Sequence, residues 1–318
     1  MVLSAAMRSL EHQAWVEQQL IRIEKAIEQA LPQGELTATR LFEALAYASL
    51  GGGKRIRALL CLASGESLGA NPESCLQAAV ALEMIHAYSL VHDDMPCMDN
   101  DVLRRGKPTV HIAFGEATAM LVGDGLQALA FEVLAGMHRT GLSARQCLQA
   151  VDVLARASGP RGMVGGQAID LALIGEASSF VELEPLQRMH QLKTGALLQA
   201  SVQLGLCCRA SEALEPETDR LLNQYAKHLG LAFQVIDDVL DASATTDSLG
   251  KTAGKDQAQQ KPTYVSLMGI GPARELAQSL HKQALDCLDQ AAHGNRALGR
   301  EGLEHLAGLA DLIVLRQR

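Results

Sequence analysis

The chain has 318 residues, of which 28 are Lys or Arg and 36 are Asp or Glu, and its formal net charge is −8. Hydrophobic residues make up 48% of the sequence and are spread along its length, which excludes a disordered or collagen-like chain. The negative balance argues against broad nucleic-acid binding, which needs a clustered excess of cations. Any anionic ligand must therefore meet local positive charge.

The first twenty residues make a poor signal peptide, because charges interrupt their weak apolar character from Arg8 onward. The longest uncharged apolar run, Thr194–Cys208, is shorter than a membrane span and contains Gln and Ser, so it predicts a buried helix and no transmembrane segment. The seven cysteines include no Cys-x-x-Cys pair, which favours reduced, mostly buried thiols over disulfides or a zinc site. We therefore expect a cytoplasmic protein.

Apolar residues recur at intervals of three and four along most of the chain, as in Leu20, Ile23 and Ile27, and this period is helical. Strand-type alternation is scarce, so no strand pair is expected. Gly and Pro break the pattern near residues 32–34, 51–53, 69–72, 106–108, 159–160, 185, 216, 247–254 and 271–272. About ten to twelve helices remain, and no break resembles a linker. The sequence predicts an all-α fold with one domain over residues 1–318.

In chain order, the first segment that suggests chemistry is Gly51-Gly52-Gly53-Lys54-Arg55-Ile56-Arg57, a glycine turn followed by three cations at a helix start. Glycine lets the backbone approach a ligand, and the amides of a helix N-terminus favour phosphate. The spacing and the missing Ser or Thr after Lys exclude a Walker loop. The segment therefore predicts a different kind of anion site.

The second segment, His92 to Asp101, places four aspartates within nine residues at the end of an apolar helical pattern. Asp93 shares a helix face with His86, and Pro96 favours a change of backbone direction that returns Asp99 toward Asp93. Clustered carboxylates repel, and a helix C-terminus favours cations. A bound divalent cation relieves both costs, and oxygen ligands suit Mg²⁺. Arg104-Arg105-Gly106-Lys107 adds cations directly after this cluster.

The third segment is Asp237-Asp238-Val239-Leu240-Asp241, which follows an apolar helical stretch. Asp237 and Asp241 lie on one helix face, where like charges cost stability unless a metal compensates them. Lys251 and Lys261 flank the polar stretch that follows. Two acidic clusters with several cationic ones predict a cavity for a magnesium-bridged diphosphate, which the metal makes a better leaving group. Lys54, Arg57 and His86 are suited to hold a second anionic substrate.

These segments resemble the short-chain trans-polyprenyl (isoprenyl) diphosphate synthases, especially the bacterial farnesyl diphosphate synthases, over nearly the whole chain. The resemblance rests on residues 52–57, 86–108, 163–167, 193–195, 234–241, 249–251 and 261–264. It implies a helical bundle around a deep central cavity, a homodimer, and three Mg²⁺ ions with diphosphate bound. It also implies that an allylic diphosphate ionises to a carbocation, that the double bond of isopentenyl diphosphate attacks this carbocation, and that the condensed product then loses a proton.

The resemblance carries roles over to matching positions. The first metal site takes Asp93, Asp94 and Asp99, and the second takes Asp237, Asp238 and Asp241. The isopentenyl diphosphate pocket takes Lys54, Arg57, His86 and Arg105. The allylic diphosphate pocket takes Arg104, Lys193, Thr194, Gln234, Lys251 and Lys261. Lys193 also joins the aspartates as a catalytic residue. Val102 stands where many relatives have another Asp, which leaves these assignments intact.

Product length is expected to depend on Tyr88, five positions before Asp93 and roughly 7–8 Å along a helix. In this family the residues before the first acidic motif shape the pocket floor, so a bulky ring there favours a fifteen-carbon product. The stretch 93–108 also resembles geranylgeranyl diphosphate synthases, which have deeper pockets, and Tyr88 has the alternative role of a core residue.

The sequence is also compatible with other classes of protein. His92-Asp93 is compatible with a His-Asp metal phosphohydrolase, although that class leaves the second acidic cluster unexplained. A terpene cyclase shares the first motif but has a different second one, and a non-catalytic subunit is expected to lack one motif. Gln167 and Asp170 are either cavity supports or packing residues.

Overall fold

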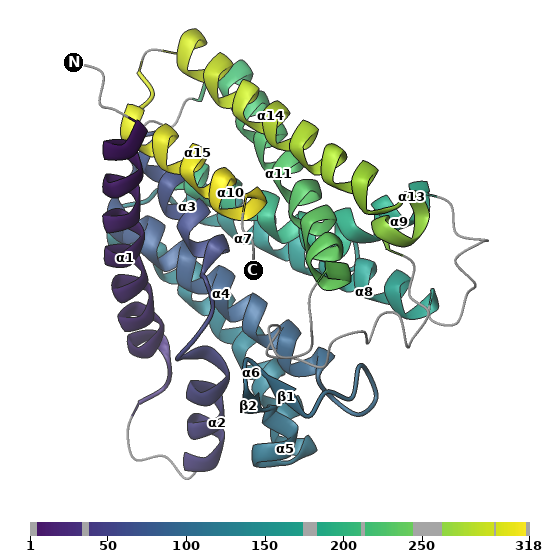
Figure 1. Ribbon diagram of the computed structural model, residues 1–318. Helices are drawn as coiled ribbons and strands as arrows, with labels where there is room; N and C mark the ends of the chain where they lie inside the picture. The colour runs from purple at the N-terminus through teal and green to yellow at the C-terminus, as the bar shows by residue number, and fades with distance from the viewer. Residues whose placement is uncertain are drawn as a thin grey trace.

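The structure is a computed structural model and describes residues 5–33, 38–173, 183–210, 214–243, 263–295 and 297–315. Helices dominate it, which confirms the predicted all-α fold (Figure 1). The N-terminal half contains α1 (Ala5–Ala30), α2 (Thr39–Ser49), α3 (Ile56–Glu66), α4 (Pro72–Asp93), α5 (Val110–Phe114), α6 (Glu116–Ala135), η1 (Gly136–Thr140) and α7 (Ala144–Ser158). The C-terminal half contains α8 (Met163–Ala172), α9 (Leu183–His190), η3 (Gln191–Gly195), α10 (Ala196–Cys207), α11 (Pro216–Ser243), α13 (Tyr264–Met268), α14 (Ile270–Gly294) and α15 (Arg300–Val314).

Helix α4 carries the first acidic motif at its C-terminus. Asn71 caps its start by accepting hydrogen bonds from the backbone N–H groups of Glu73 (2.9 Å) and Ser74 (3.4 Å), and Pro72 occupies the first helical position, where its missing N–H costs nothing. Small and branched apolar residues of α4 occupy all sides of the helix, and most of the helix is buried. His86 and Asp93 therefore lie on a helix that runs through the interior of the bundle.

Long helices pack around this centre. Figure 1 shows α11 and α14 running side by side on one side of the molecule, with α1 on the other and with α3, α4 and α10 between them. Gly205 of α10 allows the close approach to α3, because a Cβ there would lie 2.7 Å from the backbone nitrogen of Gly65. The core runs continuously through these helices and fixes the relative positions of the α4 and α11 C-terminal ends.

One short hairpin departs from the prediction that no strands pair. Strands β1 (Leu103–Arg104) and β2 (Lys107–Pro108) are antiparallel, with Arg104 opposite Lys107. The turn residues Arg105 and Gly106 have φ of 53° and 75°, the left-handed pair that suits a two-residue hairpin turn. Two-residue strands carry no alternation for a sequence pattern to reveal. The hairpin fixes the backbone on both sides of Arg105.

The remaining sequence expectations concern cysteines and membrane spans. All seven cysteines are free thiols and only Cys97 is exposed, which confirms the expectation for them. Within the described ranges, Pro72–Asp93 and Glu116–Thr140 are long and apolar enough to cross a membrane by length and composition. The most apolar window of the first is 78% buried, as in a core helix, whereas that of the second is 39% buried. The exposed face of α6 therefore needs a separate explanation.

Candidate active site

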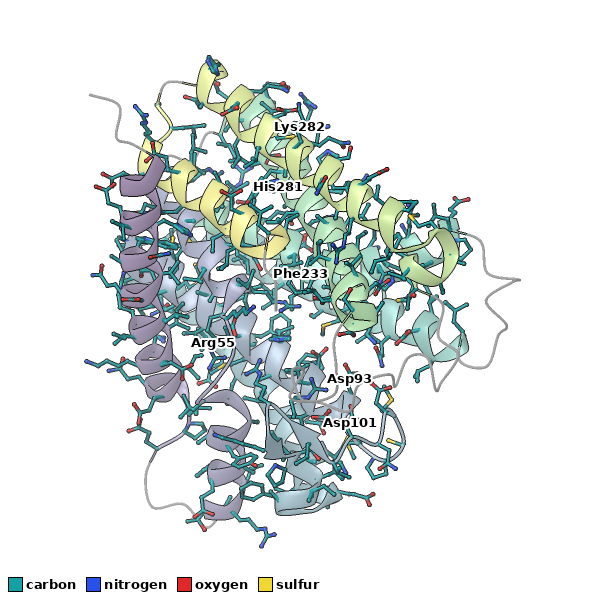
Figure 2. The ribbon with its side chains drawn as sticks, in the orientation of Figure 1. Arg55, Asp93, Asp101, Phe233, His281 and Lys282 are labelled. Atoms are coloured by element: carbon teal, nitrogen blue, oxygen red, sulfur yellow. The ribbon has the colours of Figure 1, made fainter. Side chains whose placement is uncertain are left out.

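The chain reverses direction directly after α4 and brings the first acidic cluster together. The backbone N–H of Asp99 donates to the carbonyl of Asp93 (2.9 Å), and that of Asp101 donates to the carbonyl of Asp94 (3.1 Å). Asn100 between them has φ of 52°, a left-handed conformation that Asn tolerates well. The predicted return of Asp99 toward Asp93 is confirmed. Figure 2 shows Asp93 and Asp101 close together at this end of the bundle.

Asp93 is the most perturbed carboxyl group of the cluster. The pKa of Asp93 is raised to about 6, mainly by burial; Asp99 and Asp94 contribute to the rise, and Lys193 and Arg104 oppose it. The influence of Lys193 shows that η3 lies near the end of α4. A partly buried carboxylate beside others gains free energy when a cation reaches it. Asp93 is therefore prepared to bind a cation.

Asp94, one of the predicted metal ligands, pairs with Arg104. It is 3% exposed and accepts hydrogen bonds from Arg104 through both oxygens, with Nε at 2.9 and 2.8 Å and Nη2 at 2.6 Å. Burial raises the pKa of Asp94, and Arg104 opposes that shift. A buried carboxylate with a bidentate guanidinium is already neutralised. Asp94 and Arg104 bind each other in this structure and anchor the hairpin to α4.

The glycine turn and the hairpin meet, as the isopentenyl diphosphate assignment requires. Gly53 has φ of +93°, and a Cβ on it would lie 2.7 Å from Nη2 of Arg105, so glycine is needed for both reasons. Lys54 follows on the exposed side of the turn. Arg105, the turn and the start of α3 thus form one cationic edge of the site.

Arg57 and His86 lie beneath this edge. Burial lowers the pKa of Arg57, Arg105 acts in the same direction, and Glu83 and Asp237 oppose it. The Nε of Arg57 is buried and has no hydrogen-bond partner among the described residues. Burial also lowers the pKa of His86 well below its ordinary value, and Arg57 is the strongest of four guanidinium groups that add to this effect. A neutral imidazole and an unsatisfied guanidinium suit an anionic ligand.

The second acidic cluster belongs to the same region. Because the charge of Asp237 acts on Arg57, and Arg57 acts on His86, the end of α11 faces α3 and α4 rather than the opposite surface. Figure 1 likewise shows the C-terminal end of α11 directed toward the loop after α4. Asp238 accepts a hydrogen bond from the backbone N–H of Tyr264 (2.7 Å), so one of its oxygens holds the start of α13. Asp241 is half-buried one turn further on.

A π-helical turn, η3, presents the residues predicted to contact the allylic diphosphate. It contains Lys193 and Thr194, and π turns inside helices are frequent at functional sites. Lys193 Nζ donates to Asp170 of α8 (2.6 Å). Gly166 of α8 lies so close to the backbone of Lys193 that a Cβ would overlap with it. Asp170, which the sequence left between two roles, therefore supports Lys193.

Two ring-bearing residues here, His190 and Tyr264, had no signal in the sequence. His190 Nδ1 lies 2.8 Å from Gln234 Oε1, and its ring stacks on Tyr264 at 5.4 Å. Burial lowers the pKa of His190 to about 4, although Gln234 opposes the shift. Both amide atoms of Gln167 are buried without a partner among the residues that the structure describes, which favours contact with a polar ligand over simple packing. His190 and Tyr264 belong to helices whose periodicity identifies them only as core residues.

The donor set suits magnesium better than a metal held by protein alone. In the ranges that the structure covers, no group of three or more His, Cys, Asp or Glu residues lies close enough to hold a metal ion. The acidic clusters offer carboxylate oxygens, and Mg²⁺ binds through one or two carboxylates, water and substrate phosphate. The predicted residues Lys251 and Lys261 lie outside the described residues.

The phosphohydrolase alternative loses its metal ligand. His92 Nε2 lies 3.2 Å from the carbonyl oxygen of Met120 on α6, so the imidazole packs against a helix and does not join Asp93 at a metal centre. Both acidic clusters are present, unlike in the expected non-catalytic subunit.

Comparisons with known proteins identify the family. The sequence model of the polyprenyl synthetase family matches residues 38–294. A probable farnesyl diphosphate synthase of Sinorhizobium fredii is 47% identical, over 90% of this chain and 82% of that protein. A chloroplastic geranylgeranyl pyrophosphate synthase of Capsicum annuum is 44% identical, over 86% of this chain and 72% of that protein.

Solved structures agree. The geranyltransferase of Helicobacter pylori complexed with magnesium and isoprenyl diphosphate superposes with a TM-score of 0.84 and 30% identity, over 99% of this chain and all of that one. The match to the family model covers most of the chain, and the sequence relatives exceed 40% identity. The chain therefore belongs to the polyprenyl synthetase family and is a prenyltransferase of the farnesyl diphosphate synthase type.

Proposed function

We propose that the protein condenses isopentenyl diphosphate with dimethylallyl and then geranyl diphosphate, head to tail, to give trans-farnesyl diphosphate. The observation that carries the proposal is a chain of charge interactions: Lys193 and Arg104 act on Asp93, Arg104 and Arg57 act on His86, and Asp237 acts on Arg57. This arrangement combines carboxylates for a cation with cations for two diphosphates. The relative in Sinorhizobium fredii that is named a probable farnesyl diphosphate synthase supports the same product.

The allylic diphosphate would lie between the two acidic motifs. Asp93 at the end of α4, Asp99 in the loop after it and Asp237 of α11 would face it, together with Lys193 and Thr194 of η3 and Gln234 of α11. Lys251 and Lys261, outside the described residues, are assigned to this pocket by the resemblance alone. Asp93, Asp99 and Asp237 would hold Mg²⁺ ions, three by the family pattern, which would supply stabilisation of the charge on a departing diphosphate. Lys193 is held ready by Asp170, so its ammonium group needs no reorganisation before the diphosphate departs.

Isopentenyl diphosphate would bind at the cationic edge. Lys54, Arg57 and Arg105 neutralise its diphosphate, and the unpartnered Nε of Arg57 gains its missing acceptor. His86 stays neutral at pH 7 because burial and the guanidinium groups lower its pKa, so it donates one hydrogen bond without adding charge. Holding both substrates in one pocket supplies the orientation that the condensation requires.

A homodimer accounts for the exposed face of α6. Met120 and Leu121 are 42% and 55% exposed, and Ile112 of the neighbouring α5 is 53% exposed. Apolar side chains grouped on adjacent helices favour burial against another surface, and a second copy of the chain presents the same face. We further propose a single domain over residues 1–318 and a cytoplasmic location without stable membrane insertion.

The fifteen-carbon product is proposed from Tyr88, which is 5% exposed on α4. Tyr88 precedes Asp93 by five residues, roughly 7–8 Å along the helix, so its ring is suited to close a hydrocarbon pocket that extends along α4 from the acidic motif. The geranylgeranyl alternative remains an outcome of the test, since the Capsicum annuum relative carries that name.

The test supplies the purified chain with isopentenyl diphosphate and dimethylallyl, geranyl or farnesyl diphosphate, with and without Mg²⁺, and identifies the lipids formed. Magnesium-dependent farnesyl diphosphate is expected, together with losses of several orders of magnitude in Asp93→Ala and Asp237→Ala at unchanged helicity. Hydrolysis without elongation would overturn the proposal, and a cyclic hydrocarbon would indicate a cyclase.

A further inference from the structure

Tyr88 owes its orientation to packing. Its hydroxyl is buried and makes no hydrogen bond among the described residues. Burial raises the pKa of Tyr88, and Gln127 of α6 opposes that shift without reaching hydrogen-bond geometry. The ring instead meets the imidazole of His92 edge to face, with centroids 5.9 Å apart and planes at 76°. An aromatic ring without a polar anchor takes its position from the neighbours it packs against.

His92 is itself held by α6. Its Nε2 lies 3.2 Å from the carbonyl oxygen of Met120, and its ring occupies the space above Gly123. A Cβ on Gly123 would overlap with Nε2, Cδ2 and Cε1 of the imidazole, so no larger residue is compatible with this position of His92. Glycine inside a helix costs stability relative to alanine. The imidazole of His92 is the packing reason for that cost in α6.

We propose that His92, seated against Gly123, is a positioning residue that fixes the ring of Tyr88 and thereby limits product length. The inference rests on the proposed function, because it assumes that Tyr88 stops chain growth. Tyr88 and His92 are four residues apart and share one face of α4, so a change at His92 reaches the ring directly. Length control is then a property of the contact between α4 and α6, in addition to the identity of residue 88.

The experiment measures the ratio of twenty-carbon to fifteen-carbon products from isopentenyl and geranyl diphosphate with Mg²⁺. His92→Ala removes the edge-to-face contact and is expected to raise this ratio roughly two- to tenfold. Tyr88→Ala should raise it further. In the Tyr88→Ala background His92→Ala should add nothing, because His92 acts through the ring.

Gly123→Ala tests the same contact from α6. It should displace the imidazole and raise the ratio, yet have no effect in the His92→Ala background, where the added Cβ meets empty space. Leu134→Ala, in the same helix and about 16 Å further along, is the control for general destabilisation, and its ratio should not change. If His92→Ala does not fold, Gly123→Ala still decides the question.

The outcomes separate the two proposals. If the wild type elongates and His92→Ala and Gly123→Ala keep the wild-type ratio, the inference is wrong while the proposed function stands. Additive effects of His92→Ala and Tyr88→Ala would also overturn it, since they place His92 outside the path through the ring. If the wild type gives no elongation with any allylic diphosphate, the proposed function itself fails.

Discussion

Replacing Arg55 with Met should destabilise the protein strongly, although Arg55 stands between two proposed substrate-binding residues. Its guanidinium is buried between three elements and donates to Glu24 of α1 (2.9 and 2.6 Å), Glu83 of α4 (3.0 Å) and the carbonyl of Ser49 (2.6 Å). Glu83 is 3% exposed and would keep only the backbone N–H of Ala58 at 3.3 Å. Removing one partner of a buried ion pair costs about 3–5 kcal/mol, because the remaining charge stays desolvated.

Urea unfolding followed by circular dichroism measures this cost in Arg55→Met, with Arg57→Met as the matched control. The control removes a guanidinium two residues away whose Nε has no partner and whose pKa burial lowers, so its free energy of unfolding should change by less than about 1 kcal/mol. Glu83→Gln in the Arg55→Met background should recover part of the loss, since it removes the stranded charge. Equal stability of the two single variants would refute the distinction between a structural and a ligand-facing arginine.

Two further predictions concern ionisable groups. In Asp93→Asn the metal-free protein should be more stable than wild type at pH 7.5 by up to about 3 kcal/mol. The folded-state pKa of Asp93 is raised from 3.8 to about 6, so the wild-type free energy of unfolding falls as pH rises through 6, and the variant avoids this loss. Thermal unfolding at pH 7.5 and 5 should show the difference shrinking at the lower pH, and a constant difference would contradict the cause. His305 of α15 stacks on Trp15 of α1 at 4.2 Å, and burial lowers its pKa to about 4, so the wild type loses stability as pH falls from 6.5 toward 4. His305→Phe keeps the stack without titrating and should lose about 1–3 kcal/mol less over that range in urea titrations; parallel losses would show that other groups dominate.

Much of the site could be predicted because several of its features depend on residues that are close together in the sequence. Pro96 at a helix end predicts the return of Asp99 toward Asp93. The run Gly51-Gly52-Gly53 predicts a turn, because glycine adopts a positive φ at low cost. The helical period also identified α4 and α11, the two elements that carry the aspartates. Each of these signals lies within a few residues of the feature that it predicts.

The rest depends on contacts between distant segments. The pairing of Asp94 with Arg104 needs the hairpin β1–β2, which has too few residues to show a pattern. The three cations 54, 55 and 57 look alike in sequence, yet Arg55 has φ of 48° and turns inward to Glu24 and Glu83. The π turn at Lys193 and the role of Asp170 likewise appear only when α8 lies against η3.

The site holds charges of both signs that burial disfavours, and they do not cancel one another. Asp93 has a raised pKa and Arg57 a lowered one, so each ionised group costs free energy where it stands, even though Asp237 and Lys193 moderate the effect. Moving the two groups into contact would remove this cost and also close the space between them, as has happened for Asp94 and Arg104. In the proposed complex, Mg²⁺ bound with the allylic diphosphate satisfies Asp93 and isopentenyl diphosphate satisfies Arg57, so both groups are satisfied only when both substrates are present. The separation of these charges thus reduces the stability of the free protein and favours the complex with both substrates.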